Sequence, residues 1–276
     1  MVHVRSEAEI DIIRENAMMV TATLVEVAKM LKPGITTQSL TEMAEQFIRD
    51  NGGLPSFKGY GGFPAALCIS VNEVVVHGFP SAYVLKDGDI ISVDCGFYRN
   101  GYHGDHAYTF GIGNVAPEIL EMMRITKESL YRGITQARSS NRVGDISFAI
   151  EDYTFRQHGY GVVRELVGHG VGKDLHEDPQ VPNFGRRGDG KKLVERQVIA
   201  IEPMINMGTK DVYTMDDGWT IVTGDGKPSC HYEHTVCVRR NGGEALSSFF
   251  PIEAAERANP ELSKGHLETV DQVHLA

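Results

Sequence analysis

The first fifty residues carry the hydrophobic spacing of two amphipathic helices. Ser6, followed by acidic residues, is typical of a helix cap and an acidic first turn. Apolar residues then recur at helical spacing as far as Lys32-Pro33-Gly34, a stop signal; they are Ile10, Ile13, Ala17, Val20, Leu24, Val27 and Leu31. The same reasoning predicts a second helix from Thr37 to about Asn51.

The pattern then changes to that of strands. Leu67–Val71 and Val74–Val76 are short apolar runs, and Asp89–Phe110 is rich in Ile, Val, Phe and Tyr around Asn100-Gly101. Asn-Gly is the strongest short signal for a type I′ hairpin turn. The turn predicts a register in which Tyr98 pairs with His103, Gly96 with Asp105 and Asp94 with Ala107.

This register makes Asp94 and Asp105 diagonal neighbours on one face of the hairpin, roughly 7–8 Å apart between Cα atoms. Gly96, opposite Asp105, leaves room beside the carboxylate. Two acids this close raise one another's pKa unless a cation lies between them. Taken alone, the pair is equally well explained as two solvated acids on an exposed sheet face.

A similar plan starts again after Pro117. Helices are predicted at Ile119–Ala137 and Asp145–His158, and strands follow at Val162–Leu166, Gln197–Met207, Thr220–Val222 and Tyr232–Arg239. The second helices of the two parts are offset by about 106 residues, counting from the positions in the sequence. We therefore expect an α+β domain over residues 1–246, with halves at about 5–115 and 116–246. Helices would lie outside a curved antiparallel sheet, with a site where the two halves meet.

Residues 247–276 form a polar C-terminal tail with two prolines and no strand pattern. The tail either wraps over the core or is partly disordered, and the sequence does not decide between them.

Composition excludes several classes of protein. The net charge of −10 argues against direct DNA binding, since no broad basic surface is expected. The one basic cluster, at Arg186-Arg187 and Lys191-Lys192, reads as a solvated loop or a docking patch for an anionic partner. Four cysteines without close pairing fit a reducing compartment. Neither a signal peptide nor an 18-residue apolar run is present, so a cytoplasmic protein is expected.

Seven ionisable residues lie in strand-like contexts, where burial would be costly without partners or a metal. They are His77, Asp94, Asp105, His169, His176, Glu202 and Glu233. The four acids carry −4, which two divalent cations would neutralise, and His169 adds a neutral nitrogen ligand. Such an oxygen-rich set favours Mn²⁺, Fe²⁺ or Co²⁺ over structural zinc. Any one of these residues alone is more often a hydrogen-bonded structural group than a ligand.

Five strings in this order resemble the type I methionine aminopeptidases of the pita-bread metallopeptidase family: CISVNEVVVHG, SVDCGFYRNGYHGD, GHGVGKDLHEDPQVPN, IEPMIN and YEHT. The resemblance covers about residues 5–246 and implies the pita-bread fold. It also implies that Asp94 chelates one metal and that His169 and Glu202 serve the other. Asp105 and Glu233 would bridge the two ions.

The resemblance assigns further roles. Glu202 would take the proton of the attacking water, His176 would hold the scissile carbonyl, and His77 would contact the scissile amide or the residue after it. The methionine pocket maps onto six residues: Phe57, Tyr60, Phe63, Cys68, Leu175 and Trp219. Leu175 and Phe57 depart from the family pattern and are expected to reshape the pocket mouth. Tyr60 and Phe63 could instead be loop packing, and Trp219 a core residue.

The implied activity is removal of the initiator methionine from nascent chains when the second residue is small. Two alternatives stay open: an X-Pro aminopeptidase or dipeptidase of the same fold, and a non-catalytic homologue that binds ribosomes or other partners. The X-Pro relatives usually carry a large additional N-terminal domain, and non-catalytic members typically lose ligands. We further expect a monomer, with at most transient ribosome contact.

Overall fold

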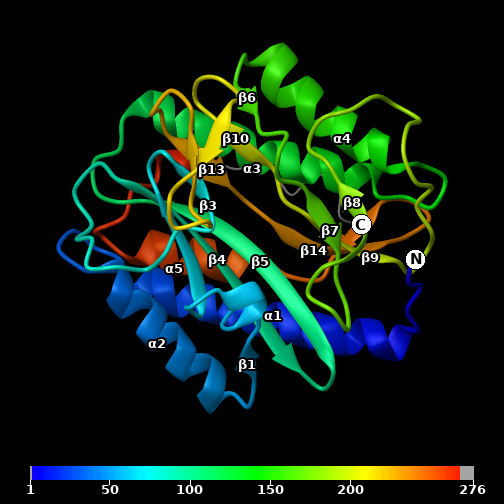
Figure 1. The fold of residues 1–276 in the computed structure, drawn as a ribbon, viewed down its shortest axis with the longest axis horizontal. Coiled ribbons are helices and arrows are strands. Elements are labelled where there is room, and N and C mark those ends of the chain that lie inside the picture. Colours follow the sequence, from blue (N-terminus) through cyan, green and yellow to red (C-terminus); the bar gives the residue numbers. More distant parts are fainter. Residues whose placement is uncertain (1, 268–276) are drawn as a thin grey trace.

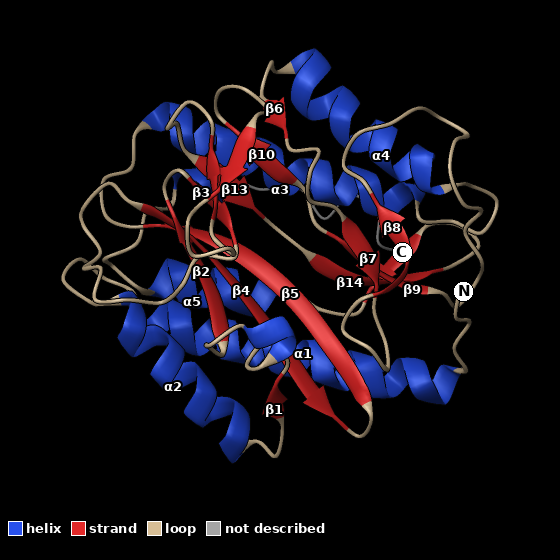
Figure 2. Cartoon of the chain, viewed as in Figure 1, coloured by secondary structure: helices blue, strands red, loops and turns tan. Residues whose placement is uncertain are grey.

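The computed structural model describes residues 2–267 of the chain. Helices lie on the outside and strands lie between them (Figure 1). Helices α1, α2 and α5 group on one side, and α3 and α4 group on the other (Figure 2). Within the described residues, no helix is long and apolar enough to cross a membrane.

The two predicted N-terminal helices are confirmed as α1 (Glu7–Met30) and α2 (Thr37–Asp50). Ser6 caps α1: its hydroxyl accepts from the Glu9 amide, and the Glu9 carboxylate accepts from the Ser6 amide at 2.8 Å. All seven apolar positions predicted from the spacing are fully buried, six of them in α1 and the seventh, Leu31, at its C-cap. Burial of that stripe presses α1 against the strands of the central hairpin.

That hairpin consists of β4 (Ile90–Arg99) and β5 (Tyr102–Gly111), and its predicted register is confirmed at all three pairs. Asn100 and Gly101 have φ values of 55° and 82°, which is the conformation that a type I′ turn requires. On its other edge β4 pairs with β2 (Leu67–Val71) and with the short β1 (Leu54–Pro55).

The second half contains α3 (Pro117–Gln136) and α4 (Val143–Glu151), which continues into a π-helical turn, η2 (Asp152–Gln157). Its main sheet has the order β15 (Gly243–Ala245), β14 (His234–Val238), β9 (Val198–Ile201), β7 (Gly168–Gly170) and β8 (Glu177–Val181).

Two smaller sheets complete the fold. One has the order β13 (Ser229–His231), β10 (Met204–Asn206) and β6 (Gly161–Val162). The other has the order β11 (Val212–Thr214), β12 (Ile221–Thr223) and β3 (Val74–Val76), so it joins strands from both halves. A short 3₁₀ turn, η1 (Tyr60–Gly62), lies in the loop between β1 and β2.

The two large sheets are joined where β14 meets β5. The Thr235 hydroxyl donates to the Asp105 carbonyl at 2.7 Å and accepts from the Asp105 amide at 3.1 Å. One residue pair along, the Glu233 amide donates to the Ala107 carbonyl at 3.0 Å. These bonds fix two acidic residues from opposite halves next to each other.

Two of the predicted strands differ from the structure. Val162–Leu166 is a strand only at its first residue, in β6, and Gln197–Met207 divides into β9 and β10 at Glu202-Pro203. Proline has no amide hydrogen for a strand ladder, so pairing is interrupted there. The interruption places Glu202 at a strand end, where its backbone carbonyl accepts from the side-chain Nδ2 of Asn183 at 2.9 Å.

The described part of the predicted tail wraps over the core. It forms α5 (Phe250–Ala258), which packs against α1, and a 3₁₀ turn η3 (Gly265–Leu267), which packs against α3. Glu256 of α5 is fully buried and accepts from the Tyr108 hydroxyl of β5 at 2.8 Å. The remainder of the predicted tail, 268–276, lies outside the described residues.

Candidate active site

The central hairpin contributes Asp94 and Asp105 to the site, as its register predicts. Gly96, however, does not leave an open space beside Asp105. A Cβ atom at Gly96 would lie 2.6 Å from Ser56 Cβ and 2.9 Å from the Phe57 ring. The missing side chain is therefore what lets the segment after β1 approach the hairpin and place Phe57 near the carboxylates.

The second half brings His169 from β7, Glu202 from the end of β9, and Glu233 from the link between β13 and β14. His169 Nε2 lies 3.8 Å from Asp105 Oδ2 and 3.5 Å from Glu202 Oε1. Ligand atoms of Asp105, His169 and Glu233 all lie within 4.8 Å of one another. The arrangement unites residues up to about 140 positions apart in the chain.

The electrostatics of this cluster favour a cation. Burial raises the pKa values of Asp94, Asp105 and Glu233 well above their ordinary range, and it raises that of Glu202 to about 8. Neighbouring carboxylates raise the first three further. Asp94 Oδ1 and Glu233 Oε1 are buried without a hydrogen-bond partner among the described residues. Orphaned carboxylate oxygens of this kind fit divalent metal ligation.

The geometry of His169 also favours a bound cation. Its Nδ1 lies 2.9 Å from the Gly170 carbonyl oxygen, an acceptor, so Nδ1 carries the proton and Nε2 has the free lone pair. Burial lowers the pKa of His169 to about 3, which keeps the ring neutral. Without a cation, the Nε2 lone pair and the carboxylate oxygens repel each other. A hydrogen bond from the other ring nitrogen to a backbone carbonyl is the usual way in which a histidine metal ligand is oriented.

Two further histidines face the same cavity. His176 is the last residue of the β7–β8 loop, and its ring meets that of His169 edge-on with centroids 4.2 Å apart. His176 Nδ1 lies 2.7 Å from the Tyr60 hydroxyl. His77 has a positive φ of 58°, which is uncommon for histidine, and burial lowers its pKa to about 4.

All thirteen residues predicted for the site line one cavity of about 530 Å³. They are Phe57, Tyr60, Phe63, Cys68, His77, Asp94, Asp105, His169, Leu175, His176, Glu202, Trp219 and Glu233. Cys68, Phe57, Phe63 and Leu175 pack together as an apolar wall, with Trp219 beside them. The Phe63 and Trp219 rings are 5.3 Å apart. Phe63 and Trp219 therefore face the cavity, rather than serving only as loop packing or core.

His231 is a site residue that the sequence reasoning missed. It is buried, and its Nε2 lies 3.6 Å from Glu202 Oε2, on the opposite oxygen from the one that faces His169. Burial lowers its pKa to about 3. The sequence feature that could have indicated a role for His231 is its position two residues before Glu233, at the end of β13. The apolar lining residues Val76, Leu166 and Met204 were also missed because nothing distinguishes them from ordinary core residues.

Comparison with known proteins gives the class. Residues 11–240 match metallopeptidase family M24, and the chain is therefore a metallopeptidase of that family. It is 53% identical over 247 residues to a methionine aminopeptidase of Clostridium perfringens, covering 90% of this chain and 99% of the relative. It is 47% identical over 247 residues to methionine aminopeptidase 1 of Bacillus subtilis, with the same coverage.

A crystal structure of methionine aminopeptidase from Thermotoga maritima has the same fold. The TM-score is 0.87 at 40% identity, over 90% of this chain and 100% of that one. The predicted α+β pita-bread fold is thus confirmed. Within M24, the chain belongs to the methionine aminopeptidases.

Proposed function

We propose that this protein removes the N-terminal methionine from peptides and nascent chains whose second residue is small. The observation that carries the proposal is the single cavity in which carboxylates, histidines and an apolar wall converge. The carboxylate cluster supplies ligands for metal-dependent hydrolysis, and the wall supplies a slot for one apolar side chain. Identity to methionine aminopeptidases over nine-tenths of the chain supports the same conclusion.

Five residues would hold two divalent ions. Asp94 would chelate the first ion, His169 and Glu202 would bind the second, and Asp105 and Glu233 would bridge them. Their oxygen-rich donor set suits Fe²⁺, Mn²⁺ or Co²⁺. Bound in this way, the ions supply an activated water nucleophile and polarise the scissile carbonyl.

Glu202 is the proposed proton acceptor for the attacking water. Its Oε1 lies 3.5 Å from His169 Nε2, and its Oε2 lies 3.6 Å from His231 Nε2. His231 faces the Glu202 oxygen that does not face His169, and it is not among the residues that line the cavity. A neutral His231 ring with its proton on Nε2 would orient the Glu202 carboxylate without competing for a metal.

His176 would donate a hydrogen bond to the scissile carbonyl and to the oxyanion that develops there. Partial desolvation lowers its pKa from the ordinary value, which favours the neutral ring. If the Tyr60 hydroxyl donates to Nδ1, the ring proton resides on Nε2. The Tyr60 contact would therefore select the tautomer that donates to the substrate.

His77 would contact the scissile amide nitrogen or the residue that follows methionine. Its ring lies 6.2 Å from that of Trp219, at the edge of the apolar wall. His77 lines the cavity and has a positive φ, a conformation that persists only where surrounding structure imposes it. Crowding by His77 would restrict the second residue to small side chains.

The methionine side chain would enter between Phe57, Phe63, Cys68, Leu175 and Trp219. A flexible thioether suits an irregular apolar slot, and sulfur–aromatic contacts add to its binding. Cys68 serves as a wall rather than a nucleophile. Burial and the neighbouring carboxylates raise the pKa of its thiol well above the ordinary value.

The two alternative functions are less consistent with the site and with the relatives. All five proposed ligands are present and converge, which argues against a non-catalytic homologue. An X-Pro aminopeptidase or dipeptidase is disfavoured because the relatives at about half identity are methionine aminopeptidases. We further propose a cytoplasmic monomer with transient ribosome contact at most, in keeping with a nascent-chain substrate.

Cleavage assays test the proposal directly. A Met-Ala-Ser peptide is compared with Leu-Ala-Ser and Met-Pro peptides in Mn²⁺, Co²⁺ and anaerobic Fe²⁺, with a chelated control. We expect metal-dependent release of methionine and poor cleavage of the leucine peptide. Absence of turnover with every metal would overturn the proposal, and preference for leucine would show that Phe57 and Leu175 have rebuilt the pocket.

A further inference from the structure

We propose that Arg5, at the start of the chain, is a positioning residue for the loop that carries His176. The inference concerns the β7–β8 loop, residues 171–176, which connects His169 to His176. It rests on the proposed function only for the role of His176. Arg5 itself is not among the residues that line the cavity.

The contact is a buried ion pair. The guanidinium Nη2 of Arg5 donates to both carboxylate oxygens of Glu177, the residue directly after His176. The side chains are only 6% and 5% exposed. Among the described residues, Arg5 is the one cation that forms an ion pair with Glu177. Removing one partner of such a pair leaves the other charge buried and uncompensated, which is far more disruptive than losing a surface pair.

Glu177 in turn organises the loop. Its Oε1 accepts from the amides of Lys173 at 2.9 Å and Asp174 at 3.3 Å, so the carboxylate closes the loop from within. The Gly172 carbonyl is held from the other side by the His103 amide of β5, at 2.8 Å. Arg5 therefore holds in place the Glu177 carboxylate, which sets the conformation of the loop between His169 and His176.

Packing around the guanidinium leaves little freedom. A Cβ atom at Gly172 would lie 2.0 Å from Arg5 Nη2, so the loop backbone rests directly on the arginine. The Arg5 guanidinium lies over the Tyr102 ring, 5.7 Å from its centroid. A shift of Arg5 would thus be transmitted to the loop backbone rather than absorbed by empty space.

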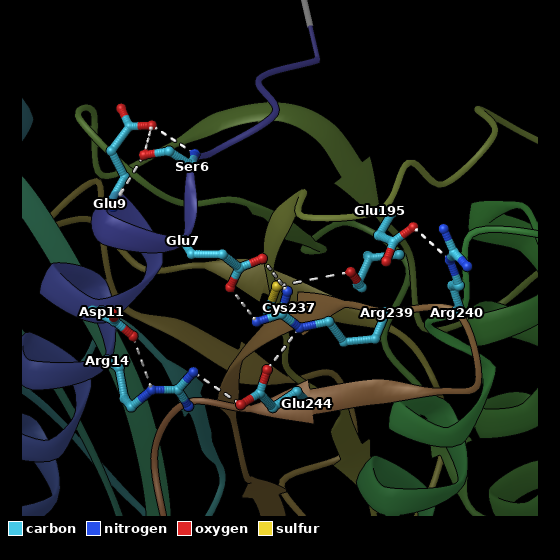
Figure 3. Close-up of polar contacts among 11 residues, drawn as sticks. Ser6, Glu7, Glu9, Asp11, Arg14, Glu195, Cys237, Arg239, Arg240 and Glu244 are labelled. Carbon is cyan, nitrogen blue, oxygen red and sulfur yellow. Dashed lines mark hydrogen bonds and ion pairs between the residues drawn. The ribbon is translucent and has the colours of Figure 1, made fainter.

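The N-terminal segment is anchored well enough to act as a support. The Arg5 amide donates to the Arg196 carbonyl at 3.0 Å, next to a bridge between Val4 and Gln197. Immediately afterwards α1 begins, and ion pairs connect its first turns to the residue after β14 and to β15 (Figure 3). These are Glu7 with Arg239 at 2.8 Å and Arg14 with Glu244 at 2.8 Å.

The test uses Arg5→Met, which keeps most of the volume of the stem, and Arg14→Met as a matched control. Arg14 lies on the same segment and also pairs with a glutamate, but its side chain is 34% exposed. Hydrogen exchange of amides 171–178 is measured in metal-free protein. Turnover of Met-Ala-Ser and Mn²⁺ affinity are measured separately.

We expect Arg5→Met to speed exchange of this loop at least tenfold and to lower kcat about 10- to 100-fold, as ~1 Å misplacements of catalytic groups do. KM and Mn²⁺ affinity should change less than about threefold, because none of the five proposed ligands is touched. Arg14→Met should match the wild type. A folded Arg5→Met protein with unchanged exchange and kcat would overturn the inference.

Two further variants cover other outcomes. If Arg5→Met does not fold, Arg5→Lys and Glu177→Gln take its place. Lysine cannot reproduce the planar guanidinium, so faster loop exchange and a reduced kcat are expected with partial rescue. Wild-type behaviour of both variants would refute the inference. If the wild type does not cleave methionine, the exchange measurements still decide whether Arg5 orders the loop, independently of the proposed function.

Discussion

Gly104 on β5 is a position where the structure predicts a large effect of a single added methyl group. A Cβ atom there would lie 2.3 Å from Ala17 N and 2.6 Å from Asn16 C. Both are backbone atoms of α1, so no side-chain rotation can relieve the clash. Because carbon contacts settle near 3.5–4.0 Å, α1 and β5 would have to separate by about 1 Å.

The cost follows from what that separation breaks. Asn16 donates through Nδ2 to the carbonyls of Arg99 and Tyr102, each at 2.9 Å, and these bonds tie α1 to the hairpin. A 1 Å shift would lengthen both beyond hydrogen-bond range, at about 1 kcal/mol each. Overpacking adds about 1–3 kcal/mol. We expect Gly104→Ala to lower the free energy of unfolding by about 3–5 kcal/mol, a large share of the 5–15 kcal/mol typical of domains.

Urea unfolding followed by far-ultraviolet circular dichroism measures this loss. Gly242→Ala is the matched control, because its nearest heavy atom would lie at an ordinary 3.7 Å and its φ is not left-handed. That variant should stay within about 0.5 kcal/mol of the wild type. Gly104→Ala should also weaken Mn²⁺ binding, since Asp105 is its neighbour. If both variants unfolded like the wild type, the close approach of α1 to β5 would not be a requirement of the fold.

Three further predictions concern the cavity. Tyr60→Phe removes the hydrogen bond to His176 Nδ1 and should lower kcat about fivefold, as loss of about 1 kcal/mol implies, with Mn²⁺ affinity unchanged. His176→Ala should lower kcat strongly while metal binding survives, whereas Glu202→Ala should damage both; normal turnover of His176→Ala would refute its oxyanion role. For His77, burial lowers the pKa from 6.5 to about 4, so the folded state disfavours the charged ring. Its contribution to stability is lost as pH falls from 6.5 towards 4, by up to about 3 kcal/mol. His77→Asn, which tolerates positive φ, should flatten that part of the stability curve of the metal-free protein, and an unaltered curve would contradict the assignment.

The central hairpin was predictable from the sequence because its determinants are local. Alternating strand residues and the Asn100-Gly101 turn leave one register, and that register places Asp94 and Asp105 as diagonal neighbours. The helices α1 and α2 were predictable for the same reason, since capping and periodicity act within a few residues. The ionisable residues of the site stood out because their surroundings are apolar.

Local sequence patterns did not predict the pairing of strands that are far apart in the chain. β3 pairs with β12, about 145 positions later in the chain, although neither strand's sequence identifies its partner. The break at Glu202-Pro203 divided a run that reads as one strand, and the tail proved to contain α5. In each case the decisive energy comes from burial against distant segments rather than from local propensity.

The sequence by itself thus determined the family, the residue types of the proposed ligands and the hairpin that carries two of them. The tertiary structure decided that His231 faces Glu202 and that Arg5 holds Glu177, a pair 172 positions apart. Neither contact produces a periodic pattern in the sequence. Which buried charges form pairs depends on which surfaces pack together, and the packing of the whole chain decides this.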